Sequence, residues 1–492
     1  MVSRFSRYII AKPQKTLIIV FMVTLFWSFF IPNLKIDFSI EHLFSKKDPN
    51  VEKYFSFREE FGREDNIISL IYKPIDYLDQ TLYQELESLI YDIDEIKGVN
   101  SIISIFSISD LDEKAWLGKI NGTKANWNHD SLLLKLKYIQ TDPSIGSRIL
   151  SKNLEYGSII LSLNDNVNNH QARSEILERI KVLTLKTSPE WTYSGVSVLR
   201  TEYVKYMVRD NFLFLPPIAI LLICILSFLF KNWVNVFLPI ITVIITVIWL
   251  LGFMGLVGLD INIMTYIVPT LLFIIGIGDA IHIQAYFREK LFNKNLDPAE
   301  AMHETVTQMF KVIFLTSITT SIGFLALTST SIKILQEFGL EIACGVMIAW
   351  IISIIVVPSG IILLNRLDYP ANRSFSPLLN WLSRTIPKNP WAFILIPILI
   401  SGTAIFKIKD LSTDSSLMDD LRPENKLYQD LKLTEKHFGG VLPFEVLLKL
   451  NPNNLSGIKK ITDNENLSYL KKIQTLLNSN LKESRFFSIN DL

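Results

Sequence analysis

Seven long apolar runs recur along the chain, and each approaches the roughly 20 residues that a helix needs to cross a bilayer. They cover residues 16–31, 212–230, 234–257, 263–286, 312–329, 338–364 and 391–406. Between residues 211 and 287, only Lys231, Asp260 and Asp279 carry a formal charge, which is not a pattern of water-soluble domains. The sequence predicts a polytopic α-helical membrane protein with about seven transmembrane helices.

The long polar region after the first run has the alternation of an α/β domain. A strand, a helix and a second strand are predicted twice in succession. The segments are 66–73, 79–95 and 99–108, followed by 156–163, 171–186 and 191–196. Two such units predict compact split-βαβ, porter-like subdomains.

Short loops rich in Lys and Arg alternate along the chain with loops that carry few cations. The positive-inside rule then places the N-terminus in the cytoplasm and both long polar regions outside the membrane. The predicted parts are a cytoplasmic N-terminus with the first helix (1–32), an external α/β domain (33–210), a bundle of five helices (211–365), a cytoplasmic linker (366–390), a seventh helix (391–406) and the start of a second external α/β domain (407–492).

Charge and cysteine content narrow the function classes. The chain has 492 residues, with 49 Lys and Arg against 48 Asp and Glu, so its charge gives nucleic acid no reason to bind. Cys224 and Cys344 both lie in apolar runs and offer the polar regions no disulfide framework. The basic segment 288–311 has apolar spacing and is expected to form an amphipathic helix on the inner leaflet.

An internal repeat aligns residues 13–62 with residues 390–439 at an offset of 377 without a gap. Nine of the fifty pairs are identical, including Pro13 with Pro390 and Asp37 with Asp414. A second match pairs residues 106–111 with 487–492. We interpret the pattern as a two-fold repeat that is cut short in its second external domain; a small external domain with chance similarity is the alternative.

Three motifs support a resemblance to a known family: the run Gly276-Ile-Gly-Asp-Ala-Ile-His-Ile283, the hydroxyl-rich segment 315–328, and Glu337-Phe-Gly339. The chain resembles the resistance-nodulation-division (RND) transporter superfamily, in its branch of MMPL (mycobacterial-membrane-protein-large) and sterol-sensing-domain-like proteins. The resemblance implies proton-driven export of lipids or other amphiphiles from the inner (plasma) membrane, with no cofactor. Expected partners are membrane lipids or an amphiphilic substrate, and a homo-oligomer or a complementary second half.

Asp279 is the candidate for proton coupling. It lies nine residues before Arg288, about 13 Å inside the predicted helix at 1.5 Å per residue. A carboxyl at this depth costs roughly 2.5–3.5 kcal/mol, so it is expected to face the bundle and to exchange a proton. In the family, this helix often carries two adjacent acids. Here the first position is Gly278, so the resemblance implies a single carboxyl; a purely structural hydrogen-bond acceptor is the alternative.

Several neighbours are candidates to pass protons to or from Asp279. His282 follows three residues later and is expected on the same helical face, although a structural histidine is the commoner case. Hydroxyls on the next helix either bond towards Asp279 or bond back to their own turn. These candidate relay residues are Thr316, Thr319 and Thr320, with Ser321 beside them.

Glu341 is a further candidate for a relay or a gate, although its position near the outer helix end favours a solvated side chain. Gly276 and Gly278 are expected to let a neighbouring helix approach closely. The sequence offers no catalytic residues and no set of metal ligands.

Two other function classes compete with transport. The Gly-x-Gly-Asp motif at 276–279 resembles intramembrane aspartyl proteases, but those enzymes need a second membrane-embedded Asp, which the predicted helices lack. No Gly-Lys nucleotide loop supports an ATP-driven pump. A lipid-binding or lipid-sensing membrane module, or a half-transporter that does not pump without a partner, stays open as the alternative.

Overall fold

The computed structural model describes residues 2–37, 40–45, 47–61, 63–106, 146–164, 170–230, 232–293, 296–364, 376–408 and 421–439, together with residues 166–167 and single residues between 133 and 140 and between 468 and 476. The chain divides into two compact units. Unit 1 combines Met1–Phe55 with Tyr206–Asp414, and unit 2 combines Ser56–Lys205 with Ser415–Leu492. The domain bounds inferred from the sequence stay a prediction.

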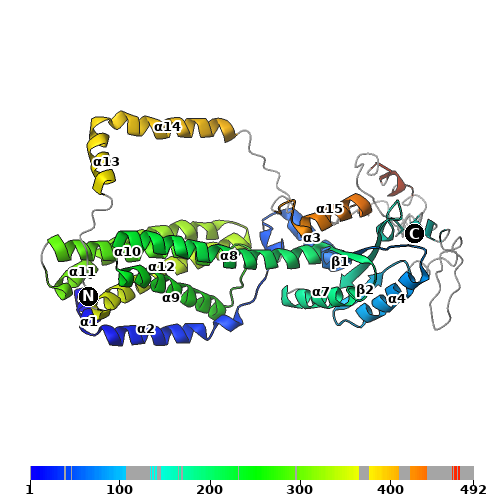
Figure 1. Cartoon of the computed structure of the whole chain (residues 1–492), viewed down its shortest axis with the longest axis horizontal. Helices are drawn as coiled ribbons and strands as arrows, with labels where there is room; N and C mark the ends of the chain where they lie inside the picture. The colour runs from blue at the N-terminus through cyan, green and yellow to red at the C-terminus, as the bar shows by residue number, and fades with distance from the viewer. Residues whose placement is uncertain are drawn as a thin grey trace, which may run out of the picture. The chain divides into compact units, whose positions relative to one another are not determined.

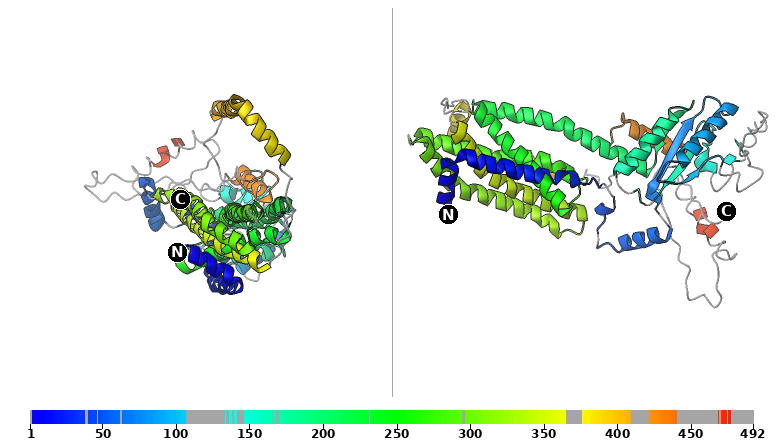
Figure 2. Two further views of the ribbon diagram at one scale, coloured as in Figure 1. Left: turned by 90° about the vertical axis from the view of Figure 1, so that its left-hand side faces the viewer. Right: turned by 90° about the horizontal axis from the view of Figure 1, so that it is seen from below.

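Unit 1 is built from long apolar helices (Figure 1). They are α2 (Pro13–Ser28), the part of α8 (Val196–Phe230) from Tyr206 onwards, α9 (Trp233–Val257), α10 (Val268–Asn293), α11 (Pro298–Leu325) and α12 (Lys333–Leu364). α12 lies at the centre and contacts α2, α9, α10 and α11, with α2 running along the bundle (Figure 2). α8 packs through Leu226 and Phe230, near its end, against α9 and α10.

Six helices of the described chain are long and apolar enough to cross a membrane. A seventh span results if α13 (Ser376–Lys388) and α14 (Pro390–Lys407) together count as one, since their apolar parts meet at a bend of 89°. The prediction of a multi-pass helical membrane protein is confirmed by this count. The predicted linker at 366–390 contains the helix α13, which the sequence analysis did not anticipate.

Local sequence signals explain where the membrane helices begin and end. The Asn232 side chain accepts a hydrogen bond from the Val234 N–H and caps α9, while Asp297 does the same for α11 through the Ala299 N–H. α9 ends at Gly258, whose φ of 78° lies in the left-handed region that glycine adopts without strain.

The basic segment 288–311 differs from its predicted interfacial helix. Its first part completes α10, and its second part is the first half of the continuous helix α11. The predicted apolar face exists, but Ala301 and Val306 are fully buried among unit 1 side chains rather than at a membrane surface. The N-terminal helix α1 (Val2–Ala11) packs against α11, where Ser6 Oγ lies 2.9 Å from His303 Nδ1.

Unit 2 contains one four-stranded antiparallel sheet in the order β2-β3-β1-β4. Its elements are β1 (Ile67–Lys73), α4 (Gln80–Asp94), β2 (Val99–Ile103), β3 (Gly157–Leu163), α7 (His170–Thr184) and β4 (Glu190–Ser194). Both predicted β-α-β units are present. They combine into one sheet in which β3 lies between β1 and β2, which is the predicted split-βαβ arrangement.

The central strand β1 explains why this sheet is stable. Leu70 pairs with Ile159 on one side and with Tyr193 on the other, and it is fully buried. Buried apolar residues of α4 and α7 join it, among them Leu86 and Ile180. The remaining short elements are η1 (Ile31–Asn33), η2 (Ile40–Leu43), η3 (Glu64–Asn66), α6 (Gly146–Ile149), η6 (Thr265–Ile267) and η7 (Ala326–Ser329).

The internal repeat has a structural counterpart. α2 begins at Pro13 and α14 at Pro390, each preceded by a residue with φ of −133°. Further along, α3 (Pro49–Phe61) and α15 (Lys426–Phe438) have bounds that differ by the offset of 377 at both ends. The second matching segment, apart from Phe106, lies outside the described residues.

Candidate functional site

Asp279 lies in the middle of α10, about 17 Å along the helix axis from its first residue, Val268. Its exposed fraction is 8%. The Ser317 side chain of α11 is its hydrogen-bonding neighbour. Its Oδ2 atom is buried and has no hydrogen-bond partner among the described residues. The carboxyl therefore has one hydroxyl neighbour and one free oxygen in an apolar bundle.

The helices around Asp279 hold it in place by close packing of α10 against α9 and α12. A Cβ added at Gly276 would lie 3.1 Å from the Val243 side chain and 3.6 Å from Ala349. Ala280, beside Asp279, is fully buried. No ion pair of the described chain includes Asp279, and an ionised carboxyl buried without a counter-charge is costly. This arrangement suits a group that gains and loses a proton.

Gly278 differs from Gly276. A Cβ at Gly278 would meet no described atom within 4 Å, so the predicted packing role holds for Gly276 alone. The position of Gly278 therefore faces open space in the described part of unit 1.

His282 does not share the buried face of Asp279, contrary to the expectation from the three-residue spacing. Asp279 is buried, whereas His282 is exposed. Three residues advance a helix by about 300°, so the two side chains diverge by about 60°, enough to turn one outwards. A relay role for His282 stays a prediction.

The threonine hydroxyls of α11 bond back to their own helix. Thr316 donates to the Ile313 carbonyl, Thr319 to Leu315, and Thr320 to Thr316, at 2.8 to 2.9 Å. The hydroxyls that point inwards are those of Ser317, beside Asp279, and Ser321, which donates to the Ala343 carbonyl of α12 at 3.0 Å. Ser317 was missed from the sequence because helical phase alone did not fix which hydroxyl faces α10.

Glu341 on α12 is fully buried, which corrects the expectation of a solvated side chain. Apart from the Thr265 hydroxyl, no described residue is a hydrogen-bond partner for either carboxyl oxygen. The Thr265 hydroxyl of η6 is the hydrogen-bonding neighbour of this carboxyl and is buried with no other partner in that part of the chain. Its nearness to a helix start suggested solvent, but the helix is covered there by neighbouring segments.

Asp279 and Glu341 lie at different depths of the bundle. α10 and α12 run in the same direction because α11 returns the chain between them. Gly276 of α10 faces Ala349 of α12. Three residues further along both helices, Asp279 is therefore level with residue 352 of α12, which lies eleven residues beyond Glu341. At 1.5 Å per residue, the two carboxyls are about 17 Å apart along the axis. They are two separate sites and do not share one proton.

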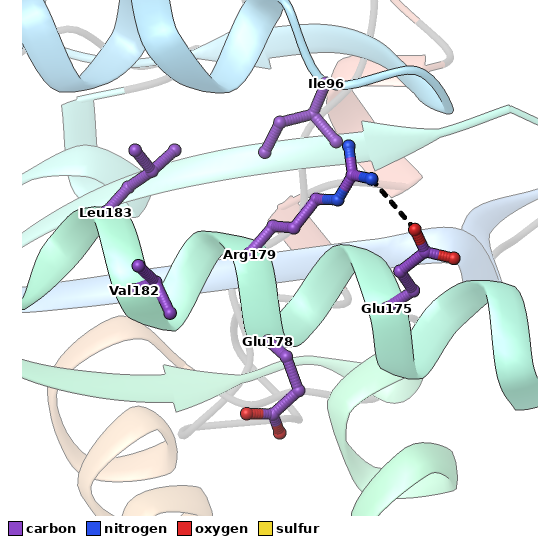
Figure 3. Close-up of a pocket in the computed structure, with 6 residues that line it drawn as sticks. All are labelled: Ile96, Glu175, Glu178, Arg179, Val182 and Leu183. Carbon is purple, nitrogen blue, oxygen red and sulfur yellow. Dashed lines mark hydrogen bonds and ion pairs between the residues drawn. The ribbon is translucent and has the colours of Figure 1, made fainter.

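A surface cavity of about 430 Å³ lies in unit 2, between the end of α4 and α7 (Figure 3). Ile96, Val182 and Leu183 supply its apolar lining, and Arg179 is paired with Glu175 at 2.9 Å. The groove is shallow and its charged residues are paired at the surface, so it is not the candidate site.

Comparison with known proteins identifies the chain. The family model described as "MMPL family" matches residues 140–393, more than half of the sequence. The chain belongs to the MMPL family. A Methanocaldococcus jannaschii protein named "Putative membrane protein MJ1562" is similar to it, with 23% identity over 382 residues that cover 74% of this chain and 93% of that protein.

The matched region of this MMPL-family protein contains both buried carboxyls, Asp279 on α10 and Glu341 on α12. Asp279 was found from its depth in an apolar run. The burial of Glu341 depends on segments far apart in the sequence, so no local pattern predicted it. Among the described residues, no group of three or more His, Cys, Asp or Glu is placed to hold a metal ion.

Proposed function

We propose that this MMPL-family protein moves lipids or other hydrophobic and amphiphilic molecules across or out of the inner membrane, driven by the proton-motive force. Asp279 is the proposed proton-coupling residue. The observation that carries the proposal is a lone carboxyl, 8% exposed, in mid-bundle with Ser317 as its neighbour. A membrane-embedded acid without a cation is a costly feature that chains keep for a task.

In the proposed cycle, Asp279 accepts a proton from water on one side of the membrane and becomes neutral. After the bundle changes its access, the proton returns to water on the other side and leaves a carboxylate. The Ser317 hydroxyl is suited to donate a hydrogen bond to that carboxylate, which lowers the cost of its brief ionised state. Charge movement in one direction thereby drives the movement of an amphiphile in the other.

The proposed orientation follows from the loops. The end of unit 1 that carries α1 and the α10–α11 connection is rich in Lys and Arg and faces the cytoplasm. The ends where α9 finishes and α12 begins then face the outside, and so does the α/β unit. A homo-oligomer or a complementary second half is the proposed partner.

The experiment that tests this function compares dye efflux in cells that express the full chain. Energised cells should expel Nile red, an amphiphilic dye, and a protonophore should stop the efflux. Asp279→Asn removes the proton-binding carboxyl with little change in volume, so we expect efflux to fall by at least tenfold at equal abundance in the membrane.

A matched control is Asp92→Asn, which neutralises an exposed aspartate on α4 and should leave efflux unchanged. Full efflux by Asp279→Asn would contradict the coupling role. Dye binding without efflux in the native protein, unaffected by the protonophore, would support the alternative of a lipid-sensing module.

A further inference from the structure

Three segments join at the end of unit 1 where α12 begins, and we call them the collar: residues 34–37 and 40–45 after α2, residues 258–267 between α9 and α10, and residues 326–337 between α11 and α12. Backbone bonds connect them. The Asp37 N–H donates to the Ile261 carbonyl at 3.0 Å, and the Ile261 N–H donates to the Lys35 carbonyl at 2.8 Å. The backbones of Ser45 and Ile332 form an isolated antiparallel β-bridge. The collar covers the start of α12 and buries side chains that would otherwise face solvent.

A chain of polar contacts crosses the collar from its surface inwards. His42 Nε2 lies 3.8 Å from Asp37 Oδ2 and 3.4 Å from Lys333 Nζ. Lys333 Nζ is 3.4 Å from Glu337 Oε1. The Asn262 amide donates to Glu337 Oε2 at 3.0 Å. From Lys333 inwards the exposed fraction falls, from 42% for the Lys333 side chain through 18% for the Glu337 side chain to 1% for Asn262.

Glu341 lies one helical turn beyond Glu337 on the same face of α12. It is fully buried, and in the described chain its carboxyl oxygens and the neighbouring Thr265 hydroxyl have no hydrogen-bond partner other than each other. The first turn of η6 is shaped by Asn262, whose Oδ1 accepts from the Thr265 N–H at 3.0 Å. A carboxyl and a hydroxyl thus share a small polar site beneath the collar.

The acidic side chains near Glu341 disfavour the ionised form of its carboxyl, because they would repel its negative charge. Glu337, one turn away, is the charged neighbour on its own helix. Asp260 in the α9–α10 connection adds to the acidic surroundings, and burial with Asp37 nearby raises the pKa of Asp260. Lys333 is held by Glu337 and His42 and does not pair with Glu341.

We infer that Glu341 is a second proton-binding site of this protein, which exchanges protons with the aqueous phase at the collar through Glu337. A proton from hydronium binds Glu337 and passes through intervening water to a Glu341 oxygen; water is left behind and the Glu337–Lys333 pair re-forms. The Thr265 hydroxyl can accept from the protonated carboxyl. That this site supplies protons for the Asp279 cycle rests on the proposed function.

The test measures protonation directly, without transport. The full chain in lipid vesicles is titrated while infrared difference spectra record the C=O stretch of protonated carboxyls. We expect a band from a buried carboxylic acid that is lost in Glu341→Gln and kept in both Asp279→Asn and Glu289→Gln, the last removing an exposed acid of α10. A Glu341→Gln spectrum equal to the native one at every pH would overturn the inference.

A second variant keeps Glu341 in place, in case Glu341→Gln does not fold. Glu337→Gln removes the neighbouring negative charge, so the band should disappear at a lower pH than in the native protein. An unchanged midpoint would contradict exchange through Glu337. Loss of the native band on adding sodium at constant pH would show that sodium competes with the proton at Glu341, and would contradict a site that exchanges protons alone.

The outcomes separate this inference from the proposed function. A Glu341 band together with full dye efflux by Asp279→Asn would contradict the proposed function and leave the inference about Glu341 standing. Absence of the Glu341 band together with lost efflux in Asp279→Asn would contradict the inference about Glu341 and leave the proposed function standing.

Discussion

Two buried aspartates of this chain have opposite surroundings. Asp279 has a hydroxyl neighbour and no ion pair among the described residues, whereas Asp65 in unit 2 binds two arginines. Arg63 contacts both Asp65 oxygens, at 2.9 and 2.8 Å, and Arg200 Nη1 lies 2.7 Å from Oδ2. Burial alone would raise the pKa of Asp65, but the Arg63 hydrogen bonds and the charges of Arg200 and Arg63 outweigh it and hold the pKa at about 2. One site is suited to proton exchange and the other to structure.

Asp65 therefore makes unit 2 sensitive to acid. Its folded pKa lies below the unfolded value of about 3.9, so its contribution is complete above pH ~4 and is lost as the pH falls through about 2. We expect about 1–2 kcal/mol from this group, allowing for partial solvent screening. Asp65→Asn should cost about 3–5 kcal/mol, because it removes a buried carboxylate that both Arg63 and Arg200 contact.

Amide hydrogen exchange of β1 and β3 in the full chain measures this effect. Asp65→Asn should speed the exchange at neutral pH and remove most of its change between pH 4 and 2, while Asp92→Asn should match the native protein. Equal protection in Asp65→Asn and native protein would show that the arginine cluster does not stabilise the sheet.

At the scale of helices and strands, the apolar runs predicted every long helix of the bundle, because a bilayer allows few alternatives. They did not predict that α10 and α11 extend into the basic segment 288–311. A helix can continue through polar residues, where the apolar run that marks it in the sequence has already ended. The alternation of apolar and polar residues also did not predict the order of the strands in the sheet. β1 and β3 are about 90 residues apart in sequence, and their pairing is decided by packing rather than by local preference.

Helix contacts depend on glycines at places where backbones nearly touch. α9 approaches α2 at Gly252, where an added Cβ would lie 2.3 Å from the Trp27 carbonyl oxygen. Nearby, the Trp249 indole N–H donates to Thr24 Oγ1 at 2.9 Å. The contact with a backbone atom leaves no side chain that can rotate away.

Gly252→Ala should therefore separate α2 from α9 and destabilise unit 1 by about 1–3 kcal/mol, as overpacking does elsewhere. Thermal unfolding of the full chain in lipid nanodiscs measures the loss as a lower midpoint. Gly278→Ala is the matched control, since its Cβ meets no described atom within 4 Å and should leave the midpoint unchanged. Similar midpoints for both variants would rule out a tight α2–α9 contact.

For the whole molecule, the repeat links sequence and structure most clearly. A weak identity, nine pairs in fifty, corresponds to α2 and α14, which begin at matching positions, and to α3 and α15, which both begin and end at matching positions. α15 also packs on the unit 2 sheet, where the Thr434 hydroxyl donates to Ser194 Oγ at 2.8 Å. The sequence predicted the succession of membrane helices and singled out Asp279 as a candidate. The burial of Glu341 and the position of Ser317 beside Asp279 depend on the three-dimensional packing of separate segments.

The most direct test of the account is lipid movement driven by an imposed proton gradient. Full-length protein is reconstituted in sealed vesicles with a fluorescent-tail phospholipid, and the appearance of the probe at the outer surface is followed with and without a pH difference. We predict that the gradient accelerates this movement at least tenfold in the native protein and in Asp92→Asn, and that Asp279→Asn shows no acceleration. Gradient-dependent movement of the same size in folded Asp279→Asn protein would contradict the proposal that this carboxyl couples protons to transport.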